Sequence, residues 1–266
     1  MKNFKLLLEV IGMTVDKQIQ IFKHLLKDKE NIVFFGGAGV STASGIPDFR
    51  SPSGLYSEGR NAGRPWNTYV PETLLSHSFF MEHTDWFYEY YKENVLHPEA
   101  RPSTCHNVLA KWEEVGKLRA VITQNIDGLH QLAGSREVVE LHGTTWENYC
   151  MTCGADYPLD YVIEQEGIPY CDLSHCKGIV RPNVTLYEEQ LPPGSMEKAI
   201  MHIQEADLLI IAGTSLAVYP AAGLIHYFRG QDTVLINLGP TPMDNEVSLP
   251  IQADINLVFS ELDTIF

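Results

Sequence analysis

Residues 31–39 read Asn-Ile-Val-Phe-Phe-Gly-Gly-Ala-Gly, and this stretch decides the fold. A short, continuous apolar run is typical of a strand that is buried on both faces, as in a parallel sheet. Glycines directly after such a strand let the backbone approach a phosphate, and a following helix would direct its N-terminus at the negative charge. The stretch does not complete a Gly-x-Gly-x-x-Gly motif, because Ser41-Thr42 stand where the last glycine would be. An ordinary tight turn therefore remains an alternative.

Similar apolar runs recur along the chain and predict further strands. They lie at residues 120–123, 208–212 and 233–237, with a weaker one at 138–141. Helical spacing of apolar side chains fills the intervals, at residues 15–30, 103–116 and 219–229. Strands that alternate with helices predict an α/β fold with a doubly wound, Rossmann-like parallel sheet.

Two insertions interrupt this pattern and divide the chain into parts. Residues 51–102 are rich in aromatic side chains and predict a helical module, and residues 146–180 contain four of the five cysteines. The Rossmann-like domain is then made of residues 14–50, 103–145 and 181–266. Residues 1–13 precede the first helical pattern and are expected to form an N-terminal extension.

Charge and hydropathy exclude several classes of function. The net charge of −15 argues against general affinity for nucleic acid, which needs a surface of Lys and Arg. No apolar run reaches the roughly 18 residues that span a bilayer. The apolar start of the chain is interrupted by Glu9, and no clear cleavage site follows, so we expect no signal peptide and a cytoplasmic protein.

The clustered cysteines predict a metal site. Cys150 and Cys153 form one close pair, and Cys171 and Cys176 form another. Four thiolates in two pairs fit one tetrahedral Zn²⁺ with no open coordination position, which indicates a structural zinc. The alternatives are His175 in place of one cysteine, a redox pair, or plain buried cysteines. The fifth cysteine, Cys105, is expected to pack in the core.

Residues 37–50, which continue from the glycines to Gly-Ile-Pro-Asp-Phe-Arg, resemble the opening signature of the sirtuins, the NAD-dependent protein deacylases, in their bacterial type. Three further motifs match in order: Thr-Gln-Asn-Ile-Asp-Gly-Leu-His at 123–130, Leu-His-Gly at 141–143, and Gly-Thr-Ser-Leu at 213–216 with Tyr-Pro-Ala-Ala at 219–222. The resemblance covers roughly residues 14–260. It implies a protein-lysine deacetylase that consumes NAD⁺ and yields nicotinamide, O-acyl-ADP-ribose and free lysine.

Three of the matching residues also suit this chemistry by themselves. Asn125 and Asp127 follow the carboxyl end of a predicted strand, where ligands bind in open α/β sheets. His142 follows another strand, and a His side chain can act as a general base at neutral pH. His130 is expected to be structural. The resemblance implies NAD contacts at Gly37, Ala38, Gly39, Thr42, Asp48, Phe49, Arg50, Gln124, Asn125, Ile126, Asp127, His142, Gly213, Thr214, Ser215, Asn237 and Ile255.

Residues 178–189 resemble the sirtuin segment that pairs with an acyl-lysine peptide as an added strand. The contacts implied are Val184, Thr185, Leu186 and Tyr187. The chain departs from the family pattern here, because Thr185 replaces an apolar residue, Tyr187 a Phe, and Glu188 a Gly. Sirtuins that prefer acidic acyl chains carry a Tyr-x-x-Arg pair. Here Tyr88 is followed by Tyr91 at the arginine position, so we expect neutral acyl groups.

Three competing functions are considered. A mono-ADP-ribosyltransferase or NAD hydrolase would keep the same NAD site, but such family members often alter the catalytic motifs, which are intact here. A dehydrogenase would need an acidic residue about 20 positions after the glycines, at the end of a second strand, and no strand pattern occurs there. A non-enzymatic sensor of NAD or ADP-ribose is disfavoured by the intact His142.

Overall fold

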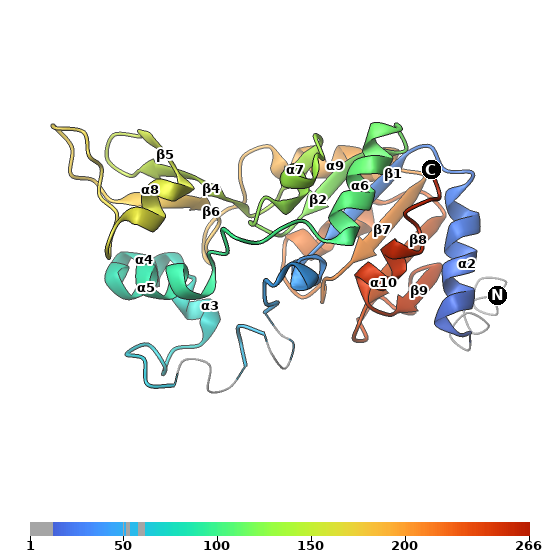
Figure 1. Ribbon diagram of the computed structural model, residues 1–266, viewed down its shortest axis with the longest axis horizontal. Helices are drawn as coiled ribbons and strands as arrows, with labels where there is room; N and C mark the ends of the chain where they lie inside the picture. The colour runs from blue at the N-terminus through green and yellow to red at the C-terminus, as the bar shows by residue number, and fades with distance from the viewer. Residues whose placement is uncertain (1–12, 50, 52–53, 58–61) are drawn as a thin grey trace.

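The computed structural model describes residues 13–49, 51, 54–57 and 62–266. Residues 1–12 of the expected N-terminal extension lie outside the described residues. The predicted NAD contact Arg50 lies outside them as well. The described chain forms a large α/β part and a smaller part beside it (Figure 1). No helix in these described ranges is long and apolar enough to cross a bilayer.

The large part is built on a six-stranded sheet in the order β3-β2-β1-β7-β8-β9, and every neighbouring pair is parallel. The strands are β1 (Ile32–Gly36), β2 (Leu118–Thr123), β3 (Val138–Glu140), β7 (Leu208–Ala212), β8 (Asp232–Asn237) and β9 (Leu249–Gln252). The chain builds outward from β1 to β3, then returns to the other side of β1 with β7. Because the winding reverses there, the β1–β7 border is the switch point where doubly wound sheets bind ligands. The predicted fold class is confirmed.

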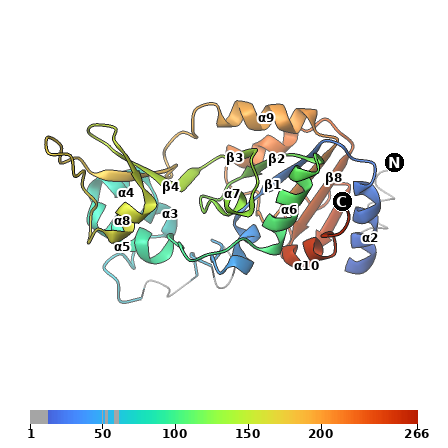
Figure 2. The same ribbon diagram turned by 45° about the horizontal axis from the view of Figure 1, so that its top comes forward.

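Alternate residues of β1 face opposite cores, which explains its continuous apolar run. Ile32 and Phe34 join a cluster with the helices α2 (Val15–Leu26), α6 (Thr104–Glu114) and α10 (Ile255–Ser260). Val33 and Phe35 join a second cluster with α9 (Ser195–Glu205) and the 3₁₀ helix η3 (Ala221–Tyr227). Figure 2 shows α9 on the opposite side of the sheet from α6 and α10.

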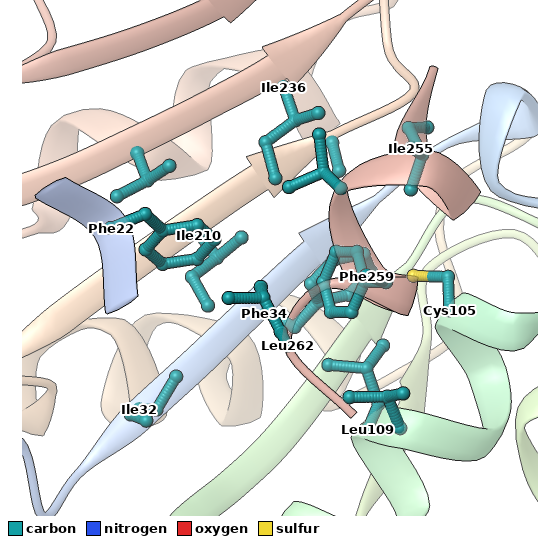
Figure 3. Close-up of a cluster of buried hydrophobic side chains, with 14 of the residues drawn as sticks. Phe22, Ile32, Phe34, Cys105, Leu109, Ile210, Ile236, Ile255, Phe259 and Leu262 are labelled. Atoms are coloured by element: carbon teal, nitrogen blue, oxygen red, sulfur yellow. The ribbon is translucent and has the colours of Figure 1, made fainter. Parts of the chain in front are cut away.

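Cys105 lies in α6 and is fully buried beside Phe259 of α10 (Figure 3). Burial raises the pKa of its thiol well above the usual range, so the thiol stays protonated and apolar in character. It belongs to the same cluster as Leu109 and Val108, in agreement with the expected packing role.

The smaller part contains a three-stranded antiparallel sheet in the order β5-β4-β6, with β4 at Gly143–Cys150, β5 at Asp156–Pro158 and β6 at Val180–Val184. Four short helices cover it: α3 (Pro71–Leu74), α4 (His77–Glu82), α5 (Thr84–Asn94) and α8 (Leu159–Glu164). One hydrophobic cluster joins Phe87 and Tyr88 of the aromatic insertion to Val162 and Cys171 of the cysteine insertion. The two insertions therefore share a core, and β6, of which Val180 falls in the expected cysteine insertion and residues 181–184 in the expected Rossmann-like domain, pairs within the smaller sheet.

Candidate functional site

Two glycine segments meet at the switch point of the sheet. The Gly37 N–H donates to Ala212 O at 3.1 Å, and the Gly39 N–H donates to Gly213 O at 2.9 Å. A Cβ on Gly37 would lie 2.8 Å from Gly213 O, and a Cβ on Gly39 would lie 2.7 Å from Gly213 Cα. Gly213 also has φ +62°, a left-handed conformation that favours glycine. Backbone contact between β1 and β7 thus requires these glycines.

The helix expected directly after the glycines does not form. Two three-residue 3₁₀ helices take its place, η1 (Ala38–Val40) and η2 (Thr42–Ser44). Gly45 follows in the left-handed conformation at φ 86°, and Pro47 cannot extend a helix. The expectation that a helix dipole holds a phosphate here was therefore wrong, because such short helices offer no sustained dipole.

Ser41 brings the two predicted polar residues of the β2 end together. Its Oγ donates to Asp127 Oδ2 at 2.6 Å and accepts from Asn125 Nδ2 at 3.0 Å. Asp127 Oδ1 accepts the Leu129 N–H at 2.9 Å, so both carboxylate oxygens are held. Ser41 and Asn125 are buried, with 1% and 9% of their surface exposed. The sequence placed Ser41 in the glycine loop but indicated no role for it.

Gln124 connects three strand ends. Its side-chain Nε2 donates to Oγ1 of Thr214, which follows β7, at 3.0 Å. Its backbone carbonyl oxygen lies 2.9 Å from Nδ1 of His142, which follows β3. Since a carbonyl can only accept, Nδ1 of His142 carries the proton and Nε2 presents its lone pair. Burial lowers the pKa of His142 below its usual 6.5, and the bond to Gln124 opposes that effect only in part. The imidazole is thus neutral at pH 7 and able to accept a proton at Nε2.

His130 lies behind this site. It is 1% exposed and its ring centroid lies 4.5 Å from that of His106. Burial, and then the neighbouring His106, lower the pKa of His130 well below its usual range. A neutral ring packed in the core agrees with the structural role expected for it.

The remaining predicted NAD positions lie around the same sheet edge, with different degrees of exposure. Thr42 and Ser215 are exposed, and Asn237 donates through Nδ2 to Gly239 O at 2.9 Å. Ile255 is 5% exposed and packs in the core cluster of α10, so little of its side chain reaches the site.

Asp48 and Phe49 open the loop that follows the 3₁₀ helices. Asp48 Oδ1 accepts the Ser51 N–H at 2.9 Å, and the backbone oxygens of Asp48 and Phe49 each accept at 2.8 Å, from Leu55 and Tyr56. The Phe49 and Tyr56 rings meet edge to face at 5.5 Å. The Tyr56 hydroxyl lies 3.0 Å from that of Tyr187, which joins this loop to the predicted peptide segment.

The predicted peptide segment uses much of its backbone internally. The Thr185 N–H donates to His142 O at 2.8 Å, and Tyr187 both donates to Leu75 O and accepts from the His77 N–H at 3.0 Å. Within the described part of the chain, no hydrogen bond uses the Thr185 carbonyl or the Glu188 N–H. These two groups therefore offer more for pairing with a peptide than Tyr187 does. Glu188 holds the left-handed conformation, φ 76°, at the position where sirtuins usually have glycine.

A buried ion pair fixes this segment, and no local sequence pattern indicated it. Arg181 donates to both carboxylate oxygens of Glu189, at 2.7 and 3.1 Å, and to Val184 O at 3.0 Å. Glu189 also accepts from the Leu186 N–H at 2.9 Å and lies 2.8 Å from His77 Nδ1. Burial alone would raise the pKa of Glu189. The hydrogen bonds, of which those from Arg181 have the largest effect, outweigh burial and lower the pKa to about 2.

The four clustered cysteines fit one Zn²⁺. Their sulfur atoms all lie within 4.8 Å of one another, with Cys150–Cys176 at 3.5 Å and Cys153–Cys171 at 3.7 Å. Tetrahedral Zn–S bonds of about 2.3 Å would separate the sulfurs by about 3.8 Å. His175 is not part of this group. Among the described residues the group consists of these four thiols alone, as expected for a structural zinc site.

In the aromatic helix α5, Tyr88 and Lys92 have hydrogen-bond partners, whereas the buried hydroxyl of Tyr91 has none among the described residues. Tyr88 Oη donates to Val180 O, and burial raises the pKa of this phenol. Tyr91 is buried and stacks on Phe87 with the ring centroids 5.5 Å apart. Lys92 Nζ donates to Gln165 O at 2.6 Å and Gly167 O at 2.9 Å, so it points to the cysteine module.

Comparisons with known proteins agree with this geometry. The Sir2 family model matches residues 37–220. An NAD-dependent protein deacetylase of Clostridium tetani is 52% identical over 237 residues, which are 89% of this chain and 93% of that protein. Its counterpart in Clostridium acetobutylicum is 52% identical over 92% of this chain and 98% of that protein. A solved Sir2 structure with deacetylated p53 peptide and 3'-O-acetyl ADP-ribose has a TM-score of 0.82 and 37% identity, over 92% of this chain and 96% of that one. A Sir2–p53 peptide–NAD⁺ structure has a TM-score of 0.77 and 38% identity over the same shares.

Proposed function

This chain belongs to the Sir2 family, and we propose that it is an NAD-dependent protein-lysine deacetylase that transfers the acyl group of a modified lysine to ADP-ribose. The products are nicotinamide, O-acyl-ADP-ribose and free lysine. The observation that carries the proposal is the hydrogen-bonded group of Ser41, Asn125 and Asp127 at the carboxyl edge of the sheet, with His142 fixed as a neutral base by the adjacent Gln124.

NAD⁺ supplies the ADP-ribose acceptor, with nicotinamide as its leaving group. The Asp127 carboxylate, which Ser41 and Leu129 fix in place, is suited to accept from the nicotinamide carboxamide. Gln124 and Asn125 carry the amides that would orient ribose hydroxyls. Because these groups are already fixed by protein contacts, little reorganisation is needed when the substrate binds.

His142 supplies the base. With Nδ1–H donated to Gln124, the free Nε2 can take a proton from a ribose hydroxyl, which makes that oxygen a better nucleophile toward the acyl carbon. The lowered pKa keeps Nε2 unprotonated at neutral pH. His142 O also accepts the Thr185 N–H, so the base and the peptide segment are held in one register.

The zinc has a structural role in this proposal. Cys150, Cys153, Cys171 and Cys176 would hold one Zn²⁺ at the core that both insertions share, because three of these cysteines belong to its hydrophobic cluster. Four thiolates leave no coordination position for water or substrate, so the metal takes no part in the reaction.

The protein substrates are acyl-lysine proteins or peptides, which pair with residues 184–188, and the place of action is the cytoplasm. Neutral acyl groups are favoured, because the Lys and Arg side chains that the structure describes near α5 are already engaged: Lys92 is bound to backbone carbonyls, Arg181 is paired with Glu189, and Arg64 is paired with Glu93. Leaving an acyl carboxylate buried without a partner would cost several kcal/mol.

The test is a panel of acetyl-, succinyl- and myristoyl-lysine peptides incubated with NAD⁺ and read by mass. Loss of the acyl mass together with nicotinamide release supports the proposal. The same assay decides the alternative, a mono-ADP-ribosyltransferase or NAD hydrolase, which would add ADP-ribose to the peptide or release nicotinamide without peptide turnover.

A further inference from the structure

The loop that follows β2 is also held by residues that take no part in the proposed reaction. Both the N–H and Oγ1 of Thr145, in β4, donate to Ile126 O, at 2.9 and 3.0 Å. The next residue, Trp146, donates its indole Nε1–H to Asp127 O at 2.8 Å. Two adjacent residues of the smaller sheet thus hold two adjacent carbonyls of the loop.

The Trp146 ring also covers Gly128. A Cβ on Gly128 would lie 2.4 Å from Nε1 of the indole, and the φ of Gly128 is +69°. Trp146 is 45% exposed, so burial gains less here than in a core position. The hydrogen bond and the close contact with the loop are what this side chain contributes.

The two sides of the loop are thereby fixed by different parts of the molecule. Ser41 of the β1 loop holds the Asp127 carboxylate at 2.6 Å, whereas Trp146 holds the Asp127 carbonyl. The strand β4 that carries Thr145 and Trp146 ends at Cys150, one of the cysteines of the zinc site. The loop is therefore a joint between the large sheet and the smaller part.

We propose that Trp146 and Thr145 are positioning residues that keep Ile126–Gly128 in the conformation that binds the nicotinamide group of NAD⁺. This rests on the proposed function, in which Asp127 receives the carboxamide. A loop released from one of these bonds spends less time in the binding conformation, and the apparent affinity falls by the same fraction. Ligands that lack nicotinamide do not use the loop and are bound as before.

The experiment compares NAD⁺ with ADP-ribose, which lacks nicotinamide, by calorimetric titration of the full-length protein. Trp146→Phe keeps a ring over Gly128 but removes the donor. Loss of one hydrogen bond should raise the dissociation constant for NAD⁺ about fivefold and leave that for ADP-ribose within about twofold. Thr145→Val, which keeps the backbone donor, should act in the same direction with a smaller effect.

Tryptophan fluorescence provides a second measurement. Binding of NAD⁺ should change the tryptophan emission more than binding of ADP-ribose does. This additional change should vanish in Trp146→Phe and persist in Trp86→Phe. Trp86 lies on α5 and stacks on His83, and among the described residues no hydrogen bond or ring contact joins it to Asp127, so the matched variant removes a tryptophan without removing a bond to Asp127.

Equal loss of affinity for both ligands, or no loss for either, overturns the positioning role. If Trp146→Phe does not fold, Thr145→Val decides by the same comparison. If the wild-type protein releases nicotinamide from NAD⁺ with an acyl-lysine peptide, but the variants bind NAD⁺ as the wild type does, the positioning role is refuted. The proposed function is then still supported. A wild-type protein that binds NAD⁺ no differently from ADP-ribose and releases no nicotinamide refutes both.

Discussion

Replacing Glu189 by Gln should destabilise the protein and weaken peptide binding more than NAD⁺ binding. The Glu189 carboxylate receives two bonds from Arg181 and one from the Leu186 N–H, and it faces His77. A Gln side chain keeps the size and one acceptor oxygen but loses the charge. Arg181 is then left buried without its counter-ion.

The magnitude follows from the burial of the pair. The side chains of Arg181 and Glu189 are 8% and 18% exposed. Removing one partner of a buried ion pair costs about 3–5 kcal/mol. Because the amide oxygen in Glu189→Gln would still accept one bond, the lower end applies, about 3 kcal/mol. For a chain of this size, about 2–4 °C of Tm is lost per kcal/mol, so Tm should fall by about 6–12 °C.

The chain contains a matched control in Lys111–Asp263, an ion pair whose side chains are 57% and 41% exposed. Exposed pairs contribute about 0–1 kcal/mol, so Asp263→Asn should lower Tm by no more than about 4 °C. Thermal melts at pH 7 compare the two variants with the wild type. Kinetics should show a higher KM for the acyl peptide in Glu189→Gln, because Gln has one acceptor oxygen where Glu189 uses two to hold Arg181 and the Leu186 N–H of the peptide segment.

The pH dependence gives a stricter test. The pKa of Glu189 is about 2 in the folded protein and 4.5 without its partners. A carboxyl group whose folded pKa is lowered stabilises fully above its unfolded pKa, and this stabilisation is lost as the pH falls toward the folded value. The Tm gap between wild type and Glu189→Gln should therefore be constant from pH 7 to about 5 and narrow below 4.5. A gap that is small at pH 7, or unchanged at pH 3, would refute the ion-pair argument.

Four further outcomes are expected. His142→Ala should retain the fold and NAD⁺ binding but lose at least about 10²-fold in deacylation rate, and near-wild-type turnover would contradict its role as the base. The wild-type rate should fall only as the pH drops through a pKa below 6.5, since burial lowers the pKa of His142. Cys150→Ala should reduce zinc content and Tm together, measured by metal analysis and thermal melting, and a metal-free variant as stable as wild type would exclude a structural zinc. kcat/KM should be higher for acetyl- than for succinyl-lysine peptides, and Tyr91→Arg should shift the preference toward succinyl; a wild-type preference for succinyl would disprove the acyl argument.

The parallel sheet could be predicted because each of its central strands is a continuous apolar run. The edge strand β9 was missed, since Leu249-Pro250-Ile251-Gln252 is short and contains a proline, which only an edge strand tolerates easily. The small sheet was missed for another reason. β4 carries polar residues such as Glu147 and Asn148 and pairs with β6 from 30 or more positions away in sequence, and no local pattern records that pairing.

The cysteine group was predicted because its spacing fits a metal site, and the structure brings the four sulfur atoms together. Asn125, Asp127 and His142 were predicted as catalytic residues from the resemblance to the sirtuins and from their places after strands. Their supports were not found. Ser41, Trp146 and the Arg181–Glu189 pair act through partners that are distant in sequence or ordinary in type, and hydrogen-bond geometry alone identifies them. Periodicity describes which face of an element is buried. It does not describe which carbonyl a side chain will reach.

The glycines at residues 37 and 39 show the limit of a motif most directly. The sequence indicates that the backbone there must come close to something, and a phosphate is one partner that fits. In the structure the close partner is Gly213, at distances where no Cβ fits, and the expected helix behind the loop is absent. These glycines are thus required by the packing of β1 against β7 whether or not a nucleotide is bound. Replacing one of them would test the fold before it tested the binding of NAD⁺, so the site is better probed through Asn125, Asp127 and His142.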